Sequence, residues 1–218
     1  MLDIYEKLFD HFGARHWWPG DTSLEVCIGA ILTQSVAWKN VEKAISNLKQ
    51  QNLLDWENLK RASAEDIEPY IIPTRFYKMK AKKIVSFVRF VEENYGSLEK
   101  MFSEDLEVLR PALLKVWGLG PETVDSILLY AGEKPTFVID AYTKRIFSRL
   151  GAIDADISYE DLRSYFQDAL PKEAPLYNEY HALIDGLGHH ICLNKKPRCM
   201  DCPLNELCNF NNTNSKKE

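Results

Sequence analysis

The chain has 218 residues, of which 45% are hydrophobic, and its formal net charge is -5. This length allows one large domain or two small ones, each with a real hydrophobic core. No apolar run approaches the roughly 18 residues that span a bilayer, and the first residues lack the pattern of a secretory signal. We therefore expect a cytoplasmic protein without membrane contact. The negative net charge by itself argues against nucleic-acid binding.

Apolar residues recur at steps of three and four through most of the chain, and alternating patterns typical of strands are nearly absent. The fold class that we expect is therefore all-α. The periodicity, together with capping residues and prolines, predicts helices over 24–32, 41–48, a short segment opening at Ser63, 80–95, 105–117, 122–131, 141–150, 159–170 and 179–186.

Basic residues are concentrated in two segments. From Arg75 to Val91 there are six basic residues and no acidic one: Arg75, Lys78, Lys80, Lys82, Lys83 and Arg89. A second group consists of Lys195, Lys196 and Arg198. Local patches of this kind bind phosphates even on an acidic protein. A solvated helix face explains either segment equally well.

Four cysteines near the C-terminus have the spacing C-x6-C-x2-C-x5-C: Cys192, Cys199, Cys202 and Cys208. Four thiolates suit a [4Fe–4S] cluster or a structural zinc ion. The long first gap departs from the paired C-x2-C knuckles that are usual for zinc, which favours the cluster. Two disulfides are the remaining alternative, but they require an oxidising compartment.

The segment 113–128 has the pattern of a helix, a tight turn and a second helix. Gly118 and Gly120 flank Leu119 in the turn, and Pro121 suits the first turn of the second helix. Backbone N–H groups at such a helix start form a phosphate site. A monovalent cation often bridges a hairpin of this kind to DNA. A plain pair of packed helices has the same pattern.

The order of these motifs resembles the endonuclease III branch of the HhH-GPD superfamily of DNA glycosylases. In that order the hairpin comes first, then Asp140 after the apolar run 136–139, then the four cysteines. The resemblance covers nearly the whole chain and includes Ile-Leu-Thr-Gln-Ser at 31–35, Tyr-Lys-Met-Lys-Ala at 77–81 and Lys-Pro-Arg-Cys at 196–199.

The resemblance implies two helical domains and a damaged duplex DNA as partner. One domain covers 22–131 and ends with the helix–hairpin–helix. The other joins 1–21 to 132–218 and contains the [4Fe–4S] loop, 192–208. Asp140 is then the catalytic carboxylate, which stabilises positive charge on the sugar or activates a water. Taken alone, without the hairpin and the cysteines, Asp140 is better explained as a cap for the helix that follows it. We expect a monomer.

Glu122 departs from the pattern of bifunctional relatives. Those relatives carry a lysine two residues after the second hairpin glycine, and its amine forms a Schiff base that leads to strand cleavage. A carboxylate cannot form that intermediate, so the resemblance implies a monofunctional glycosylase. Lys144, one turn after Asp140, is the alternative amine.

The segment His-Trp-Trp-Pro-Gly at 16–20 is similar to that of the 3-methyladenine DNA glycosylase III group. That group also has the pattern G-x-G-x-E-[ST]-x-D, matched here by Gly118, Gly120, Glu122, Thr123 and Asp125. The resemblance places Trp17, Trp18, Pro19, Trp38 and Glu122 at the pocket for the damaged base. A methylated purine is positively charged, and the face of an indole ring attracts it. Without the resemblance, paired tryptophans usually anchor a core.

The resemblance also implies a set of DNA contacts. Gln34 and Ser35 lie where relatives insert a polar side chain into the gap left by the flipped nucleotide. The other predicted contacts are Gly118, Leu119, Gly120, Thr123, Lys195, Lys196 and Arg198. The function that we expect is hydrolysis of the N-glycosidic bond of alkylated purines. The alternatives are an endonuclease III-type glycosylase for oxidised or deaminated pyrimidines, and a non-catalytic iron–sulfur DNA-binding protein.

Overall fold

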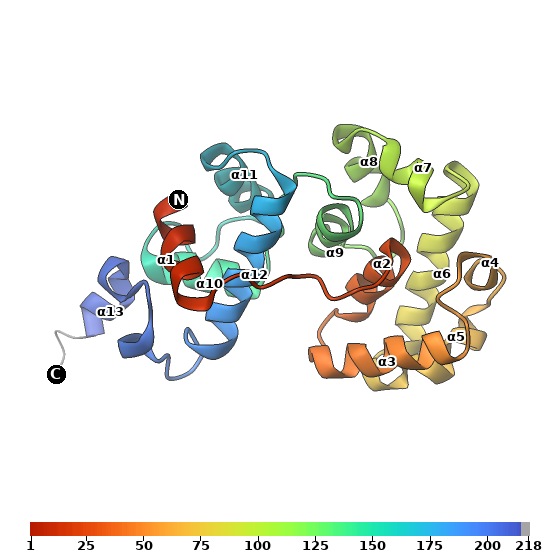
Figure 1. The fold of residues 1–218 in the computed structure, drawn as a ribbon, viewed down its shortest axis with the longest axis horizontal. Helices are drawn as coiled ribbons and strands as arrows, with labels where there is room; N and C mark the ends of the chain where they lie inside the picture. The colour runs from red at the N-terminus through yellow and green to blue at the C-terminus, as the bar shows by residue number, and fades with distance from the viewer. Residues whose placement is uncertain (215–218) are drawn as a thin grey trace. The chain divides into compact units, whose positions relative to one another are not determined.

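The computed structural model describes residues 1–214, and every regular element in that range is a helix (Figure 1). The all-α prediction is therefore confirmed. The chain divides into two compact units, which are described separately below. We call Trp18–Lys134 the hairpin unit, and Met1–Trp17 with Pro135–Glu218 the cysteine unit. The domain limits 22–131 and 1–21 plus 132–218 stay a prediction, and residues 215–218 lie outside the described part.

The hairpin unit is a continuous stretch of chain built around one buried helix. Its elements are α2 (Ser23–Leu32), α3 (Trp38–Gln50), α4 (Trp56–Leu59), α5 (Ala64–Ile71), the 3-10 turn η1 (Ile72–Thr74), α6 (Tyr77–Asn94), α7 (Leu98–Ser103), α8 (Leu106–Leu113), α9 (Pro121–Ser126) and the π-helical turn η2 (Ile127–Ala131).

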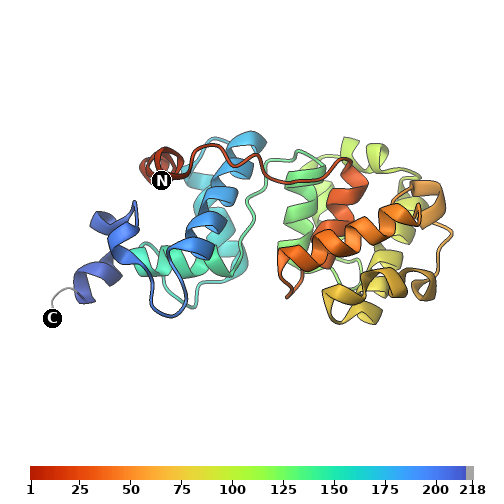
Figure 2. The ribbon, with the colours of Figure 1, turned by 60° about the horizontal axis from the view of Figure 1, so that its bottom comes forward.

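Helix α2 is the centre of the hairpin unit because, apart from Glu25 in its first turn, it is apolar around its whole circumference. All its residues from Leu24 to Leu32 are buried, and it contacts α3, α6, α9 and η2 (Figure 2). A helix without a polar face has to lie inside a core. Thr22 caps its start, since the threonine side chain accepts a hydrogen bond from the Glu25 N–H.

A buried ion pair joins α8 to α9. Asp125 is fully buried, and its two carboxylate oxygens accept hydrogen bonds from Arg110 Nε at 2.7 Å and Arg110 Nη2 at 2.9 Å. This two-point geometry is the strong form of the arginine–carboxylate interaction. The pair therefore sets the orientation of the helices on either side of the predicted turn.

The cysteine unit joins residues from the two ends of the described chain. Its elements are α1 (Leu2–Phe12), α10 (Ala141–Leu150), α11 (Tyr159–Ala169), α12 (Ala174–His190), the 3-10 turns η3 (Cys199–Asp201) and η4 (Asn205–Leu207), and α13 (Asn209–Asn214). Helices α1 and α10 both pack on α12 (Figure 1). The core between them is aromatic: Phe137 stacks on Phe166 with 4.1 Å between ring centroids, and Phe147, Tyr177 and Tyr180 are fully buried.

Most predicted helices are present, with shifted limits. The predicted helix 105–117 ends at Leu113, and the predicted helix 179–186 is part of the longer α12. Four described helices lacked a sequence-based prediction: α1, α4, α7 and α13. Within the described residues, no helix is long and apolar enough to cross a membrane.

Replacement of Asp125 by asparagine should destabilise the protein by about 3 kcal/mol, because the Arg110 guanidinium then stays inside without a countercharge. The measurement is the free energy of unfolding in urea. Arg61→Met is the matched control, since Arg61 pairs with Glu57 on the surface, and it should change the stability little. Equal losses in the two variants would show that the buried Asp125–Arg110 pair matters no more than a surface pair.

Candidate functional site

Asp140 occupies the N-cap of α10, as the sequence allowed. Its Oδ1 accepts two hydrogen bonds at 2.7 Å, from the backbone N–H and from the hydroxyl of Thr143. Its Oδ2 lies 3.8 Å from Nε2 of His181. Asp140 is half-buried and His181 is buried. Capping therefore engages one oxygen, and the other oxygen remains for chemistry. The capping and catalytic interpretations of Asp140 are compatible.

A second carboxylate, Asp185, lies near Asp140 and was missed from the sequence. Asp185 is one turn after His181 on α12, so the two side chains share a helix face. Burial raises the pKa of the Asp185 carboxyl; the nearby His181 opposes this shift and the charge of Asp140 adds to it. The spacing of four residues between His181 and Asp185 was the available signal, but a helix contains many such pairs.

Three of the predicted base-pocket residues line one cavity of the hairpin unit. Trp18, Pro19 and Trp38 surround a space of about 280 Å³, whose lining also includes the carboxylates of Glu25 and Glu42. The rings of Trp18 and Trp38 meet edge to face, with 5.0 Å between their centroids. A Cβ atom at position 29 would lie 3.4 Å from the Trp18 ring, so the indole packs directly against α2 at Gly29.

The other two predicted base-pocket residues do not line this cavity. Trp17 is half-buried and belongs to the cysteine unit. Glu122 is exposed in the first turn of α9, and its carbonyl accepts a hydrogen bond from the Ser126 hydroxyl at 2.7 Å. The structure thus brings together Trp18, Pro19 and Trp38 from the predicted set.

The hairpin has the predicted turn. Gly118 has a φ of 85°, whereas Gly120 has a φ of -91°, which any residue adopts. A Cβ atom at position 118 would lie 2.5 Å from the Lys83 side chain, so a side chain is excluded there by space as well as by backbone angle. Leu119 is buried, and Gly120 precedes Pro121 at the N-cap of α9. The open N–H groups of this helix start are a chemically suitable phosphate site.

Gln34 and Ser35 have different environments. The Gln34 side chain joins three elements: its Nε2 donates to the Thr123 hydroxyl at 2.8 Å and to the Gly118 carbonyl at 3.5 Å, and its Oε1 accepts from Lys83 Nζ. Thr123 is buried in this network. Ser35 is exposed and has a φ of 56°. Of the two, Ser35 is the side chain presented to solvent.

Arg75 and Phe76 form a strained, exposed turn that sequence reasoning missed. Their φ values are 54° and 44°, which is uncommon for residues other than glycine, and Phe76 is 74% exposed. Each such residue costs on the order of 1–3 kcal/mol and persists where the surroundings impose it, often at functional sites. The sequence signal was weak: one aromatic residue just before a helix.

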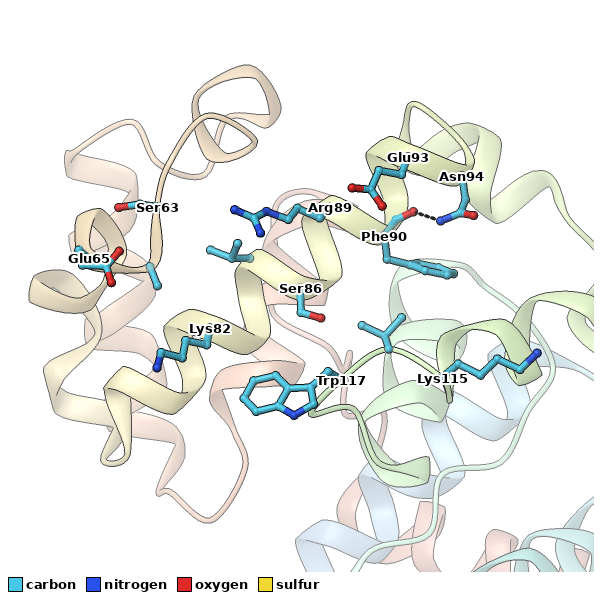
Figure 3. A pocket seen from close by; sticks show the side chains of 13 residues that line it. Ser63, Glu65, Lys82, Ser86, Arg89, Phe90, Glu93, Asn94, Lys115 and Trp117 are labelled. Atoms are coloured by element: carbon cyan, nitrogen blue, oxygen red, sulfur yellow. Dashed lines mark hydrogen bonds between the residues drawn. The ribbon is translucent and has the colours of Figure 1, made fainter.

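A shallow groove of about 550 Å³ lies beside the hairpin and has mixed charge. Figure 3 shows Lys82, Arg89 and Lys115 around it together with Glu65 and Glu93. Trp117, which is 54% exposed, forms one wall. The two carboxylates offset much of the positive charge, so the groove is a weaker phosphate site than the basic residues alone suggested.

Lys80 is not part of the basic surface predicted over 75–91. Only 2% of it is exposed, and it lies on the buried face of α6 with Ala81 and Ile84. The position of Lys80 four residues before Ile84 and seven before Phe87 was the signal that it faces the core.

The four C-terminal cysteines line one small cavity of about 20 Å³, together with Arg149. Arg149 Nη1 donates to Cys192 Sγ at 3.2 Å and to the Leu193 carbonyl at 2.7 Å, and Arg145 Nε donates to the Cys192 carbonyl at 3.0 Å. Burial, together with the charges of the other three cysteines, raises the pKa of Cys202 to about 11. No three His, Cys, Asp or Glu side chains in residues 1–214 form a ready single-ion site.

The predicted basic contacts between these cysteines are exposed. Lys195 and Lys196 have no acidic partner within the described residues, and Lys196 has a φ of 54°. Arg198 pairs with Asp201, with 2.8 Å between Nη2 and Oδ2. The loop therefore presents two unpaired lysines and one neutralised arginine.

The class of protein follows from the comparison with known families. Residues 28–172 match the family model described as HhH-GPD superfamily base excision DNA repair protein, and the chain belongs to this family. It is 45% identical to a relative from Methanocaldococcus jannaschii that carries the name "Putative DNA repair glycosylase MJ1434", over 95% of both chains.

Two solved structures show the same fold. The 3-methyladenine DNA glycosylase MagIII of H. pylori, bound to 1,N6-ethenoadenine, has a TM-score of 0.73 and 25% identity, covering 84% of this chain and 92% of that one. A trapped endonuclease III–DNA covalent intermediate has a TM-score of 0.82 and 22% identity, covering 98% and 95%. The second likeness is one of fold alone.

Replacement of Asp185 by asparagine should raise the melting temperature at pH 7, because the ionised carboxylate is penalised by burial. The folded-state pKa of Asp185 is raised, so the folded protein binds the proton more readily and this penalty grows as the pH rises above the ordinary aspartate value. The gap between the variant and the wild type should therefore close toward pH 3. A gap that is constant from pH 3 to pH 7 would contradict this assignment.

Proposed function

We propose that this base excision repair glycosylase is monofunctional and releases alkylated purines, such as 3-methyladenine, from damaged duplex DNA. The observation that carries the proposal is the cavity lined by Trp18, Pro19 and Trp38. Indole faces attract a cationic base by about 0.5–2 kcal/mol. Lys49 in the same lining pairs with Glu25 at 2.8 Å, so Glu42 is the carboxylate proposed to add to the attraction. Trp17 and Glu122 are proposed to complete the recognition of the base.

Asp140 is proposed as the catalytic carboxylate. Loss of a purine from the sugar leaves positive charge on the ring, and an ionised Oδ2 stabilises that charge or takes a proton from the attacking water. The Thr143 contacts hold Oδ1, so the direction of Oδ2 is set by the start of α10. An alkylated purine is already a good leaving group, so one carboxylate and a stacking pocket are sufficient.

The proposed DNA contacts follow from exposure and charge. The N–H groups of Gly118 and Gly120 bind a backbone phosphate, with a monovalent cation as bridge, whereas the Leu119 N–H donates to the Val116 carbonyl at 3.2 Å and supports the turn. Lys195 and Lys196 contact another phosphate, and Arg198 joins them when it leaves Asp201. Ser35 is the side chain that enters the gap left in the duplex by the flipped nucleotide. Thr123 and Gln34 contribute indirectly, because their hydrogen bond supports the turn from inside. The protein is proposed to act as a cytoplasmic monomer.

The four cysteines are proposed to hold a [4Fe–4S] cluster. The residues fit this group: four thiols surround one cavity, and Arg149 Nη1 donates a hydrogen bond to Cys192 Sγ. When bound, the cluster supplies a covalent cross-link for a polar loop that is too short to fold alone. Arg145 and Arg149 hold the start of this loop by its backbone carbonyls.

An endonuclease III-type activity on oxidised or deaminated pyrimidines is the second candidate. It is favoured by relatives such as the endonuclease III of Thermotoga maritima, which is 29% identical over 88% of this chain. A bifunctional enzyme of that kind needs an amine nucleophile, and Lys144 Nζ donates to the Ile157 carbonyl at 2.7 Å. That hydrogen bond holds the amine on the backbone, which argues against it as the nucleophile.

Asp140→Asn should slow the release of base from methylated duplexes by about 100- to 10,000-fold while duplex binding is retained. Asparagine caps a helix as well as aspartate does, so the variant separates catalysis from capping. The measurement is single-turnover base release from a panel of methylated, oxidised and uracil-containing duplexes, with products identified by mass spectrometry. Asp55→Asn, a similar cap on α4, is the matched control and should be fully active.

Several outcomes of this panel would overturn the proposal. Release of pyrimidines alone, or a covalent adduct trapped by borohydride, would favour the endonuclease III type. A wild-type protein that binds duplexes but releases no base from any lesion would favour a non-catalytic DNA-binding protein.

Cys202→Ser should abolish iron binding, whereas Cys27→Ala should retain it, because Cys27 is buried in the core of the hairpin unit. The measurements are iron, sulfide and zinc content and the visible absorption of anaerobically purified protein. Iron and sulfide in equal amounts are expected for the wild type. Zinc without sulfide, or retention of iron in the Cys202 variant, would contradict the cluster assignment.

A further inference from the structure

Lys80 is a buried cation without an acidic partner. Its Nζ donates to the carbonyl of Leu32 at 2.8 Å and to the carbonyl of Thr74 at 2.6 Å. No carboxylate in the described residues lies within ion-pairing distance of it. A lysine is almost never this buried unless it is paired, since the ammonium loses its hydration. Burial, with the nearby Lys83, lowers its pKa to about 8.

The two carbonyls belong to two segments that present exposed side chains. Leu32 ends α2, three residues before the exposed Ser35. Thr74 ends η1, directly before the strained pair Arg75 and Phe76. The backbones of both segments are therefore hydrogen-bonded to the same atom, Nζ of Lys80.

The surrounding contacts make Lys80 the link between these segments. Thr74 is fully buried, and its hydroxyl donates to the Ile71 carbonyl at 2.8 Å, so the η1 side is tied to the end of α5. On the α2 side, Lys83 of the next helical turn holds Gln34. The positive φ values of Ser35, Arg75 and Phe76 need such support, because an unsupported chain would relax to ordinary angles.

We propose that Lys80 is a positioning residue that holds the Ser35 segment and the Arg75–Phe76 segment at a set spacing. The side chains of Ser35 and Phe76 then enter the duplex together when a nucleotide is displaced. This inference rests on the proposed function, because it assumes that the protein unstacks a base. The side chain of Lys80 itself contacts no DNA. It acts through the two carbonyls that it binds.

The first test compares Lys80→Met with wild type on a duplex that contains an abasic-site analogue opposite 2-aminopurine, whose fluorescence rises when it is unstacked. Methionine fills the same space without a donor, so the variant should fold but leave both carbonyls unheld. Its fluorescence increase should be much smaller than that of wild type, with unchanged affinity for undamaged duplex. Lys43→Met, at an exposed position on α3, is the matched control.

The second test measures single-turnover base release. Lys80→Met should be about 10- to 100-fold slower than wild type on a fully paired methylated duplex, which is the range expected for a misplaced group. On a duplex that lacks the base opposite the lesion, its rate should return close to the wild-type rate, because the gap no longer has to be filled. A role in stability alone would slow both duplexes equally.

Wild-type fluorescence in the variant, or equal losses of rate on both duplexes, would overturn the proposal. If Lys80→Met does not fold, Lys80→Gln replaces it: the glutamine amide is one bond shorter and cannot reach both oxygens, so wild-type fluorescence would again overturn the role. If the wild-type protein releases no base, the proposed function fails. The fluorescence comparison needs no catalysis and still tests Lys80.

Discussion

The last carbonyl groups of α2 lie inside the protein, and the arrangement of the hairpin unit depends on how they are satisfied. A helix end leaves carbonyls without partners in the helix, and inside a core they need other donors. Both the hydroxyl and the N–H of Thr33 donate to Gly29, and Lys80 donates to Leu32. Thr33 directly follows α2, whereas Lys80 is 48 residues away in sequence. These donors bring α6 and η1 against the segment that contains Ser35.

The same principle links the hairpin to α2. Gln34 uses its amide nitrogen on Thr123 and its amide oxygen on Lys83, so the turn around Gly118 is supported by a side chain 84 residues earlier. In the cysteine unit, Oδ1 of Asp140 accepts a hydrogen bond from the Thr143 N–H at the start of α10, and Oδ2 takes no part in this cap. In each case a polar group required by helix geometry also orients a candidate functional group.

Sequence patterns identified the fold class, the hairpin turn and the capping position of Asp140, because each depends on neighbours in the chain. Gly118 was recognisable from its motif, and its positive φ is a local property. Lys80 was wrongly assigned to a basic surface, because counting basic residues over 75–91 does not show which face of the helix each lysine or arginine occupies. Its spacing to Ile84 and Phe87 contained that information. Asp185, Phe76 and the arginines that hold the cysteine loop depend on contacts between distant segments, which spacing does not reveal.

The packing of α1 on α12 has a consequence for the order in which the protein folds during synthesis. Residues 18–134 are continuous, so this stretch can collapse as soon as it leaves the ribosome. Helix α1 is made earlier, yet its packing surface on α12 and the Tyr180 hydroxyl that donates to the Met1 carbonyl are made only after the whole hairpin unit. More than 160 residues are translated between the end of α1 and the start of α12, and the apolar face of α1 is without its packing partner during that time. Helix α1 is thus translated before the hairpin unit but packs after it.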